Sequence, residues 1–368
     1  MSTSANSDRA PANGSGAPDE PDPIRGRAHG RSAVPLSILD LAPVGVATTP
    51  GDALATTTEL AKSAENWGFH RLWVAEHHGM PGIASSSPSV VIAHLASATS
   101  TLRLGSGGVM LPNHAPLVVA EQFGTLQALH PGRIDLGIGR APGTDQGTAR
   151  ALRRTSGPLS ADDFPQQLGE LMAFMGDGFP ADHPYVEVQS VPHGQAPPVW
   201  LLGSSGFSAQ VAGALGLPFA FAHHFSARNT IPAMELYRES FQPSAVLDEP
   251  YALIGVQTIA ADTDEEALDL TRPIALNMLR LRRGSPGPIP SPEEAREYPY
   301  SEVEQSFVDS WLADAVYGSP QRVRTELEEL RERTGANELM LTANMYDRES
   351  KLHSYELIAR EYGLPGVA

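Results

Sequence analysis

The regular alternation of short apolar segments with helical segments constrains the fold of this chain most. Eight segments have the length and composition of buried strands, and a helical segment follows each of them; the strands cover residues 36–41, 71–75, 102–111, 133–138, 198–202, 217–222, 251–260 and 338–342. Strands that alternate with helices predict a parallel sheet covered by helices. Eight such units predict an α/β fold of the (β/α)8 TIM-barrel type, with insertions after strands four and seven.

An open, doubly wound sheet is the alternative fold for the same alternation. That fold places a Gly-x-Gly-x-x-Gly turn after its first strand when it binds dinucleotides, and no such turn follows residues 36–41 here. The helical segments are clear, as in the stretch that begins at Pro116, where apolar residues recur at helical spacing. The barrel is therefore the preferred prediction.

The composition of the first 33 residues differs from that of the rest of the chain. They are rich in Ser, Ala, Pro, Gly and Asp and contain almost no large apolar residue. A segment of this kind cannot bury enough apolar surface to offset the entropy of ordering, so we expect a disordered tail over residues 1–33 and one barrel domain over residues 34–368. The tail has neither the apolar core of a signal peptide nor the acid-poor composition of a transit peptide, so a cytoplasmic protein is expected.

Charge and residue usage exclude several functional classes. The formal net charge of −17 argues against nucleic acid and anionic membranes as partners. No apolar run approaches the roughly 20 residues of a membrane helix. Cysteine is absent, which excludes thiolate catalysis and Cys-based zinc sites. The only lysines, Lys62 and Lys351, lie in helical segments, whereas a Schiff-base enzyme needs a buried lysine at a strand end.

The second strand, residues 71–75, ends in three ionisable residues: Glu76, His77 and His78. In a barrel, the carboxyl ends of the strands hold the chemistry. Histidine is the usual acid or base at neutral pH. Because successive residues of a strand face opposite ways, we expect only one of the two histidines to enter the pocket. The alternative is a structural role for both imidazoles beside Glu76.

Two other strand ends indicate a ligand that contains a phosphate. Arg140 follows the fourth strand in a glycine-rich stretch and is a fixed cation of the kind that binds phosphate. The fifth strand runs into a turn at a helix N-terminus, where free backbone amides favour an anion. The residues of this turn are Gly203, Ser204 and Ser205. A surface ion pair for Arg140 and an ordinary strand–helix turn are the alternatives.

The third strand ends in small residues at Ser106, Gly107 and Gly108. Backbone without side chains can approach a flat ligand closely, although a simple turn at the end of the barrel explains the glycines equally well. A metal-dependent hydrolase is a further alternative for the fold. Metal sites of barrels usually use His-x-His on one strand, and this sequence has only adjacent pairs at 77–78 and 223–224, so no metal ligand is predicted.

Taken together, these motifs resemble the luciferase-like family of flavin-dependent monooxygenases, near its bacterial alkanal monooxygenase branch. The resemblance covers most of the chain from Leu36 onward. It rests on Glu76-His77-His78, on the turn at Gly203, and on the stretches at residues 105–112, 116–122 and 131–140. The order and spacing of these motifs are more specific than any single one of them.

The resemblance implies a barrel that holds FMN across the strand ends. His77, next to Glu76, matches the family's catalytic histidine, and Gly107–Gly108 matches a position at which the family has a cis peptide that does not involve proline. Arg140, with the backbone of Ser204 and Ser205, would hold the flavin phosphate. Gly139 stands where light-emitting members have a reactive cysteine, which argues against light emission.

The resemblance also implies a mechanism and partners. A separate flavin reductase would supply reduced FMN, which would react with O2 to give a peroxyflavin that oxygenates a small organic substrate. We expect a homodimer, with residues 283–305 as a lid over the site. An F420-dependent oxidoreductase that transfers a hydride is the alternative within the same fold family. A further alternative is a relative that binds flavin but catalyses no reaction.

Overall fold

Strand β10 (Glu338–Thr342) closes the predicted barrel by pairing with both its first and its seventh strand. In the register of these parallel pairs, Leu339 lies opposite Leu36 of β1 and opposite Ile254 of β8. The computed structural model describes residues 22, 24–141, 143–153 and 163–366. Because the sheet closes on itself, the (β/α)8 prediction is confirmed and the open doubly wound sheet is excluded.

Within the described residues, eight parallel strands form the barrel, and the third of them is split into two pieces. They are β1 (Leu36–Asp40), β2 (Arg71–Val74), β3 (Arg103–Ser106) with β4 (Val109–Met110), β5 (Ile134–Gly139), β6 (Val199–Gly203), β7 (Phe219–Phe221), β8 (Ala252–Ala260) and β10. A further short strand, β9 (Val316–Gly318), pairs with the far end of β8.

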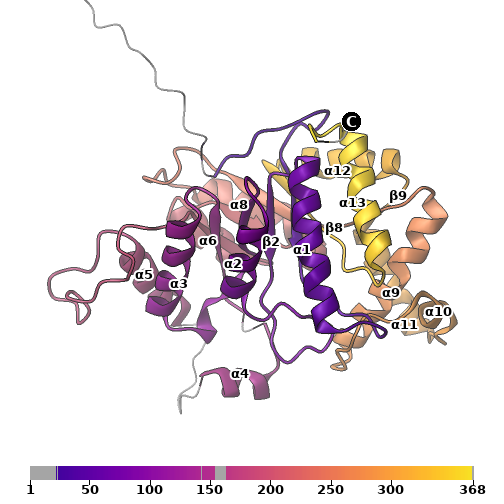
Figure 1. Cartoon of the computed structure of the whole chain (residues 1–368), viewed down its shortest axis with the longest axis horizontal. Helices are drawn as coiled ribbons and strands as arrows, with labels where there is room; N and C mark the ends of the chain where they lie inside the picture. The colour runs from indigo at the N-terminus through magenta and orange to yellow at the C-terminus, as the bar shows by residue number, and fades with distance from the viewer. Residues whose placement is uncertain (1–21, 23, 142, 154–162, 367–368) are drawn as a thin grey trace, which may run out of the picture.

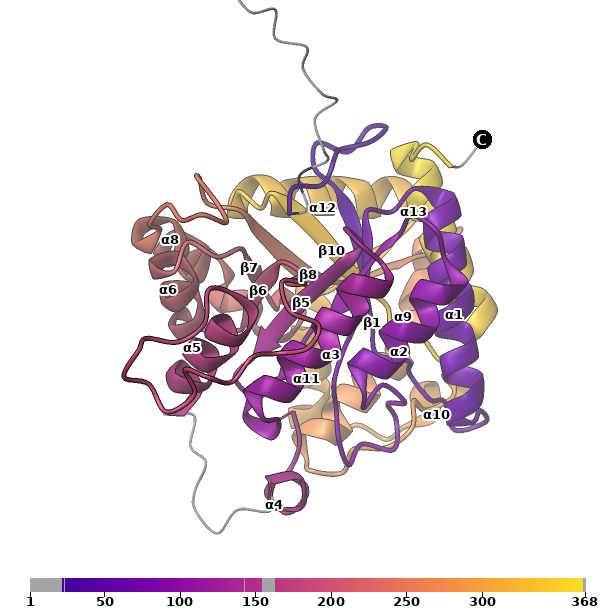
Figure 2. The ribbon, with the colours of Figure 1, turned by 60° about the vertical axis from the view of Figure 1, so that its left-hand side comes forward.

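The helices surround the strands on the outside of the barrel (Figures 1 and 2). The long helices after successive strands are α1 (Pro50–Trp67), α2 (Pro88–Ala98), α3 (Pro116–Leu129), α5 (Phe164–Met175), α6 (Gly206–Ala214), α8 (Thr230–Ser240), α9 (Asp264–Arg282), α12 (Pro320–Thr334) and α13 (Arg348–Tyr362). Further helical elements lie in the connections; they are η1 (Leu111–Asn113), α4 (Gln146–Arg153), α7 (His223–Ser226), η3 (Ala227–Asn229), α10 (Pro292–Glu297) and α11 (Glu302–Asp314).

The sequence pattern predicts a helix from about Leu54 to Trp67 that Gly68 closes. The helix found there, α1, begins four residues earlier, at Pro50. Thr49 is the N-cap and forms a capping box with Asp52, and Pro50 occupies the first turn. Pro is favoured there because its missing N–H would have no partner inside the helix. The helix ends at Gly68, which has a φ of 87° and donates its N–H to Ala64. Gly68 was expected in this position.

The third strand is interrupted by the cis peptide bond between Gly107 and Gly108, at the position that the family resemblance implied. Before the break, β3 pairs with β2 and β5; after it, β4 pairs with β5 alone. The N–H of Gly107 donates to the carbonyl of Val74 at 2.8 Å. The break therefore lies next to the end of β2, where the ionisable residues follow.

A network of buried charges joins strands inside the barrel. The Arg71 guanidinium is fully buried and contacts Asp135 of β5 at 2.9 Å and Glu338 of β10 at 2.9 Å. Burial opposes the charge on Arg71, but the two carboxylates outweigh that effect and raise its pKa. Removal of one partner from such a buried network would leave an uncompensated charge, so these residues tie β2, β5 and β10 together.

The connections differ from the sequence prediction in two places. In the insertion after the fourth strand the sequence predicts one helix, near residues 164–174. That helix is α5, and the insertion contains α4 as well. The segment 283–305 was expected to be an irregular loop, and it contains α10 and the start of α11, which pack on α9 through a small apolar cluster. Its acidic, proline-containing composition is typical of a loop, yet the segment forms helices whose N-caps are Ser291 and Ser301.

The expected disordered tail, residues 1–33, lies for the most part outside the described residues. The described part begins with residues that pack on the barrel: Ile24 is 3% exposed, and its carbonyl accepts a hydrogen bond from Arg71. The domain boundary at residue 33 stays a prediction, and the contact between Ile24 and Arg71 ties part of the preceding segment to the barrel. No helix in the described ranges has the length and apolar character needed to cross a membrane.

Candidate active site

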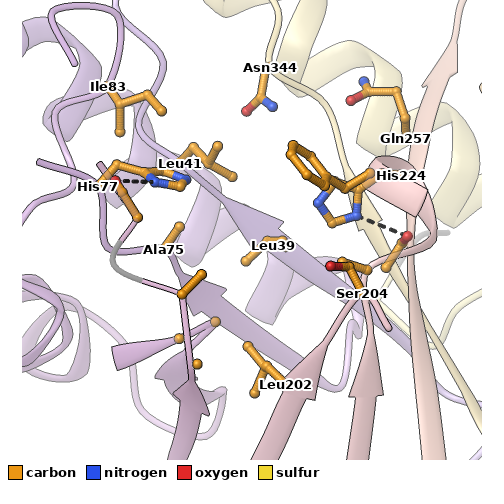
Figure 3. Close-up of a pocket in the computed structure, with 18 of the residues that line it drawn as sticks. Leu39, Leu41, Ala75, His77, Ile83, Leu202, Ser204, His224, Gln257 and Asn344 are labelled. Carbon is orange, nitrogen blue, oxygen red and sulfur yellow. Dashed lines mark hydrogen bonds between the residues drawn. The ribbon is translucent and has the colours of Figure 1, made fainter. Parts of the chain in front are cut away.

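A cavity of about 410 Å³ lies at the carboxyl ends of the barrel strands. This volume is typical of sites for small molecules and cofactors, and the position is where barrels hold their chemistry. Most of the wall is apolar (Figure 3). The apolar side chains include Leu39, Leu41, Trp73, Ala75, Met80, Ile83, Leu202, Phe221, Leu253 and Met340.

His77 faces this cavity, and His78 does not (Figure 3). The Nδ1 of His77 lies 3.4 Å from the carbonyl oxygen of Gly143. A carbonyl only accepts hydrogen bonds, so Nδ1 bears the proton and Nε2 is left as an acceptor. Burial lowers the pKa of His77, and the hydrogen bond to Gly143 opposes this effect only in part. The expectation that one histidine of the pair enters the pocket is confirmed.

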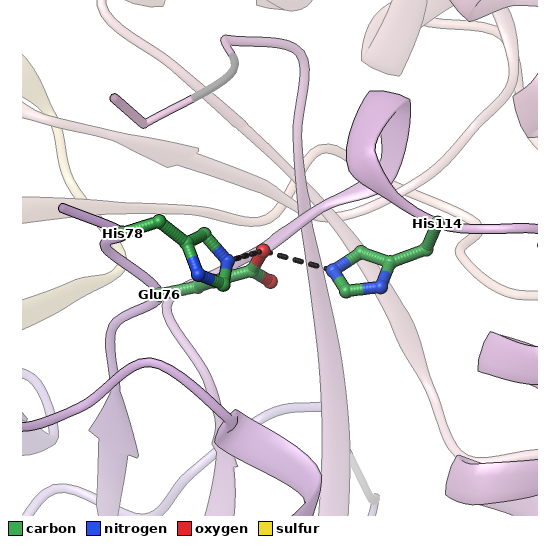
Figure 4. Close-up of side chains that lie close together, drawn as sticks. All are labelled: Glu76, His78 and His114. Atoms are coloured by element: carbon green, nitrogen blue, oxygen red, sulfur yellow. Dashed lines mark hydrogen bonds and ion pairs between the residues drawn. The ribbon is translucent and has the colours of Figure 1, made fainter. Parts of the chain in front are cut away.

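Glu76 lies behind the strand end and is fully buried. Its Oε1 accepts hydrogen bonds from Nε2 of His78 and Nε2 of His114, both at 2.8 Å, and its Oε2 accepts one from the amide of Met110 at 3.0 Å (Figure 4). Burial alone would raise the pKa of Glu76, but these hydrogen bonds hold it below its usual value. Glu76 does not line the cavity, and its contacts are those of a residue that positions the strand end. The catalytic role predicted for it stays a prediction.

This cluster also has the composition of a metal site. One ligand atom from each of Glu76, His78 and His114 lies within 4.8 Å of the others. The sequence spacing did not indicate such a group, because His114 comes from the segment after η1 and meets the other two only in the fold (Figure 4). None of the three residues lines the cavity. The cluster therefore gives no support to a hydrolytic metal centre in the cavity.

Arg140 and the start of α6 lie together at another part of the cavity wall. The Arg140 guanidinium stacks over the Phe207 ring at 4.2 Å, and Phe207 belongs to the first turn of α6. Ser205 is the N-cap of this helix, and its side chain makes no capping hydrogen bond. Within the described residues, no carboxylate lies within ion-pair distance of Arg140. A free cation beside an uncapped helix N-terminus is the arrangement expected for an anion such as a phosphate.

The remaining residues of this turn are placed as expected: Gly203, Ser204 and Ser205 all line the cavity. Gly203 is also required by packing, since a Cβ there would lie 2.6 Å from Cβ of Ser208 in α6. The close approach of the strand end to the helix brings the backbone of the turn to the cavity surface. The fold thus brings together the residues predicted for an anion site, from the end of β5, the end of β6 and the start of α6.

Gly107 and Gly108 also line the cavity, but Ser106 does not. The Ser106 hydroxyl donates to the carbonyl of Gly137 and accepts from its amide, both at 3.0 Å, so it joins β3 to β5. Ser106 is thus not among the residues that line the cavity, and its contact with a cofactor stays a prediction. Packing leaves little room at either glycine: a Cβ on Gly108 would lie 2.8 Å from the backbone oxygen of Gly137, and one on Gly107 would lie 2.6 Å from Cδ1 of Leu39.

Four polar residues of the wall were not selected from the sequence: His224, Gln257, Asn277 and Asn344. His224 follows the sixth predicted strand, residues 217–222, and the sequence predicts no function for it. Gln257 had the clearest signal, since it is a polar residue within the apolar strand β8. Asn277 and Asn344 had none, because polar residues are common in helices and in loops after strands.

The segment before α10 covers part of the cavity. Pro286, Gly287 and Ile289 line it. The backbone of Ile289 exchanges hydrogen bonds with Val44 and Val46, at 2.8 and 3.0 Å, so the segment is joined to the loop after β1. Gly287 lies against Gly82, where a Cβ would come within 2.2 Å of the Gly287 oxygen. The N-terminal part of the expected lid, residues 283–305, is thus placed over the site.

Comparisons with known proteins find a family model and relatives that match most of this chain. A family model described as luciferase-like monooxygenase matches residues 34–338. A luciferase-like monooxygenase of Escherichia coli (strain K12) is 47% identical over 326 residues, which are 88% of this chain and 96% of that protein. An N-acetyl-S-alkylcysteine monooxygenase of Bacillus subtilis (strain 168) is 34% identical over 327 residues, which are 88% of this chain and 97% of that protein.

Solved structures agree with the fold. A crystal structure of apo-MsnO8 superposes with a TM-score of 0.81 at 36% identity, over 90% of this chain and 99% of that one. The family match includes the second strand end with its histidines, Arg140 and the turn before α6. The barrel, the site at its mouth and these relatives lead to one conclusion: the chain belongs to the luciferase-like monooxygenase family.

Proposed function

We propose that this protein is an FMN-dependent monooxygenase that uses reduced FMN and O2 to oxygenate a small organic substrate. The observation that supports this most is the arrangement of the cavity. An unpaired Arg140 and an uncapped helix N-terminus lie at one part of a largely apolar wall, and His77, whose pKa burial lowers, faces the same space. This combination suits a ligand that has a phosphate at one end and a flat ring system at the other.

The residues of the wall suit FMN in their chemistry. Arg140 and the amides at the start of α6 would bind the phosphate through charge-assisted hydrogen bonds. Gly107 and Gly108 present bare backbone to the cavity, which would let a flat ring lie close to the end of β3. When bound in the reduced form, which a separate flavin reductase would deliver, FMN supplies the two electrons with which one O2 oxygenates the substrate and forms water.

His77 would act as the proton acceptor and donor of the site. Its Nδ1 hydrogen bond to Gly143 orients the ring and leaves Nε2 free toward the cavity. Its lowered pKa keeps this nitrogen unprotonated at neutral pH, ready to take a proton from a ligand and to return it. The apolar wall and the segment with Ile289 would keep bulk water away from this exchange.

The names of relatives support a monooxygenase. Distant solved structures bind either FMN or F420 and so do not decide between the two cofactors. The Bacillus subtilis relative at 34% identity is named a monooxygenase. A diketocamphane monooxygenase component in complex with FMN and an alcohol dehydrogenase in complex with an F420 adduct share the fold at 20% and 17% identity. At such identities only the fold is comparable, so hydride transfer with F420 is the outcome against which the proposal is tested.

Binding experiments distinguish the two cofactors. Trp73 and Trp311 line the cavity, so a bound ring system should quench tryptophan fluorescence. Titration with FMN, reduced FMN and F420 should show saturable quenching by FMN in both redox states and weaker binding of F420. Tighter binding of F420, with no binding of reduced FMN, would refute the proposal.

A further inference from the structure

One wall of the cavity is polar, in contrast to the rest. Gln257 of β8, Asn344 after β10 and His224 lie on the same side of the cavity (Figure 3), and Asn277 of α9 also lines it. Arg140 is the only residue with a permanent charge among the described lining residues. The polar wall therefore offers uncharged hydrogen-bonding groups inside a mainly apolar space.

One buried atom in each amide of this wall has no hydrogen-bond partner among the described residues. Gln257 is 4% exposed, and its Nε2 makes no hydrogen bond to any described residue. The Oδ1 atoms of Asn277 and Asn344 are likewise buried and without a partner. A buried polar atom without a hydrogen bond costs about 1–3 kcal/mol, so native proteins keep such atoms rarely, and a bound ligand or an ordered water is what would complete them.

His224 adds an acceptor of known orientation to the same wall. Its Nδ1 lies 3.0 Å from the carbonyl oxygen of Gly255, so Nδ1 bears the proton and donates. Burial lowers the pKa of His224, which keeps the ring neutral and Nε2 an acceptor. His77 lies on the opposite side of the cavity (Figure 3), so His224 is not a second member of the same histidine pair.

We propose that Gln257, Asn277, Asn344 and His224 form a subsite for an uncharged –CO–NH– group. The carbonyl of that group would accept from the Gln257 amide, and its N–H would donate to an asparagine oxygen or to His224 Nε2. The apolar wall would take the attached hydrocarbon. This inference deepens the proposed function and rests on it for the identity of the bound molecule.

The lack of charge on this wall decides which polar group it suits. A carboxylate or an ammonium would be buried beside amides with no opposite charge, which costs far more than burial of a neutral group. An ester has the carbonyl but no N–H, so it would leave the acceptors of the wall unpaired. A secondary amide of a substrate and the pyrimidine ring of a flavin both contain the required –CO–NH– group.

The test compares ligands that differ only in the N–H. N-hexylacetamide and hexyl acetate have nearly the same shape, and their binding to the full-length protein saturated with FMN can be followed by calorimetry. If a substrate amide is the ligand, wild-type protein should bind the amide roughly tenfold more tightly than the ester. Gln257→Leu should abolish this preference.

Two further variants make the comparison specific. Gln127→Leu is the matched control, since Gln127 also has a buried amide oxygen without a partner but does not line the cavity. It should keep the preference for the amide. If circular dichroism shows that Gln257→Leu does not fold, Asn344→Leu takes its place. We expect Asn344→Leu to reduce the preference for the amide over the ester as well.

A second arm tests the flavin as the source of the –CO–NH– group. FMN is compared with 3-methyl-FMN, in which a methyl group replaces the hydrogen on the ring nitrogen and so removes the N–H donor. If the flavin fills the subsite, wild-type protein should bind FMN roughly tenfold more tightly than its methyl derivative, Gln257→Leu should remove the difference, and the amide and ester should bind alike.

Equal affinities within both pairs of ligands, unchanged in Gln257→Leu, would overturn the inference, because solvent would then satisfy these groups equally well. A protein that fails to bind FMN at all would instead refute the proposed function. The comparison of amide and ester on the flavin-free protein would still test the subsite in that case.

Discussion

Glu76 and His77 are neighbours in the chain, yet their side chains lie on opposite sides of the end of β2. Glu76 is buried among His78, His114 and the amide of Met110, and His77 faces the cavity. The carboxylate binds both the residue after His77 and the segment after the cis peptide, so it fixes the strand end from behind. The two residues therefore contribute to one site in different ways.

Replacement of His77 by alanine separates binding from chemistry. His77→Ala should leave the Kd of FMN within about twofold and lower the oxygenation rate of any accepted substrate by roughly 100-fold or more, the usual contribution of an acid–base group. Flavin titration and oxygen consumption measure the two effects. The control is His94→Ala, at an exposed position of α2. Unchanged turnover in His77→Ala would remove its catalytic role.

Replacement of Arg140 tests the phosphate site. Arg140→Ala should weaken FMN binding by roughly 10- to 100-fold, since a charge-assisted hydrogen bond is lost, and should leave riboflavin binding unchanged. Arg140→Lys should restore part of the affinity, because the charge returns without the planar guanidinium. If Arg140→Ala weakens FMN and riboflavin equally, the side chain does not bind the phosphate.

The contact between Gly82 and Gly287 tests the covering segment. In Gly82→Ala the new Cβ would lie 2.2 Å from the backbone oxygen of Gly287, so the segment has to move away. We expect FMN to be released several-fold faster, measured by displacement in a stopped-flow instrument. Gly169→Ala in α5, where a Cβ meets no atom within 4 Å, is the control. Equal release rates in both variants would mean that this segment does not retain the ligand.

His223 should make the fold sensitive to acid. Its side chain is buried and hydrogen-bonded to Thr230 at 2.7 Å, and burial lowers its pKa from 6.5 to about 4. Between these values the unfolded chain binds a proton that the folded chain does not, so stability falls as the pH drops from 6.5 toward 4 and levels off below. The loss is of the order of 3 kcal/mol for this group, at 1.36 kcal/mol per pKa unit.

Urea unfolding at pH 7.5 and pH 5 measures this effect. His223→Gln should reduce the difference in unfolding free energy between the two pH values, since glutamine does not titrate in this range. The exposed substitution His94→Gln should leave the difference as in the wild type. An undiminished difference in His223→Gln would show that other groups dominate the acid response.

The sequence predicted the fold well because its strands are local features. Buried parallel strands are continuous apolar runs, and their ends were found within a few residues. The chemistry at these ends, His77, Arg140 and the turn at Ser204, followed from the known position of barrel sites. Helix α1 began early because its cap, Thr49 with Pro50, resembled a loop.

What the sequence did not predict depends on contacts between distant segments. His114 reaches Glu76 across 38 residues of chain. Ser106 was expected at the ligand, but its hydroxyl is used by Gly137 of the neighbouring strand. The amides of the polar wall come from β8, α9 and the end of β10, and only closure of the barrel brings them to one cavity.

The central claim is best tested by mixing the protein, saturated with reduced FMN, with O2 and recording flavin absorbance over time. We predict an intermediate spectrum, distinct from those of oxidised and reduced FMN, that lasts longer than in a protein-free control and is shortened in His77→Ala. Direct reoxidation at the protein-free rate in wild-type protein, with no such spectrum, would contradict the proposed monooxygenase.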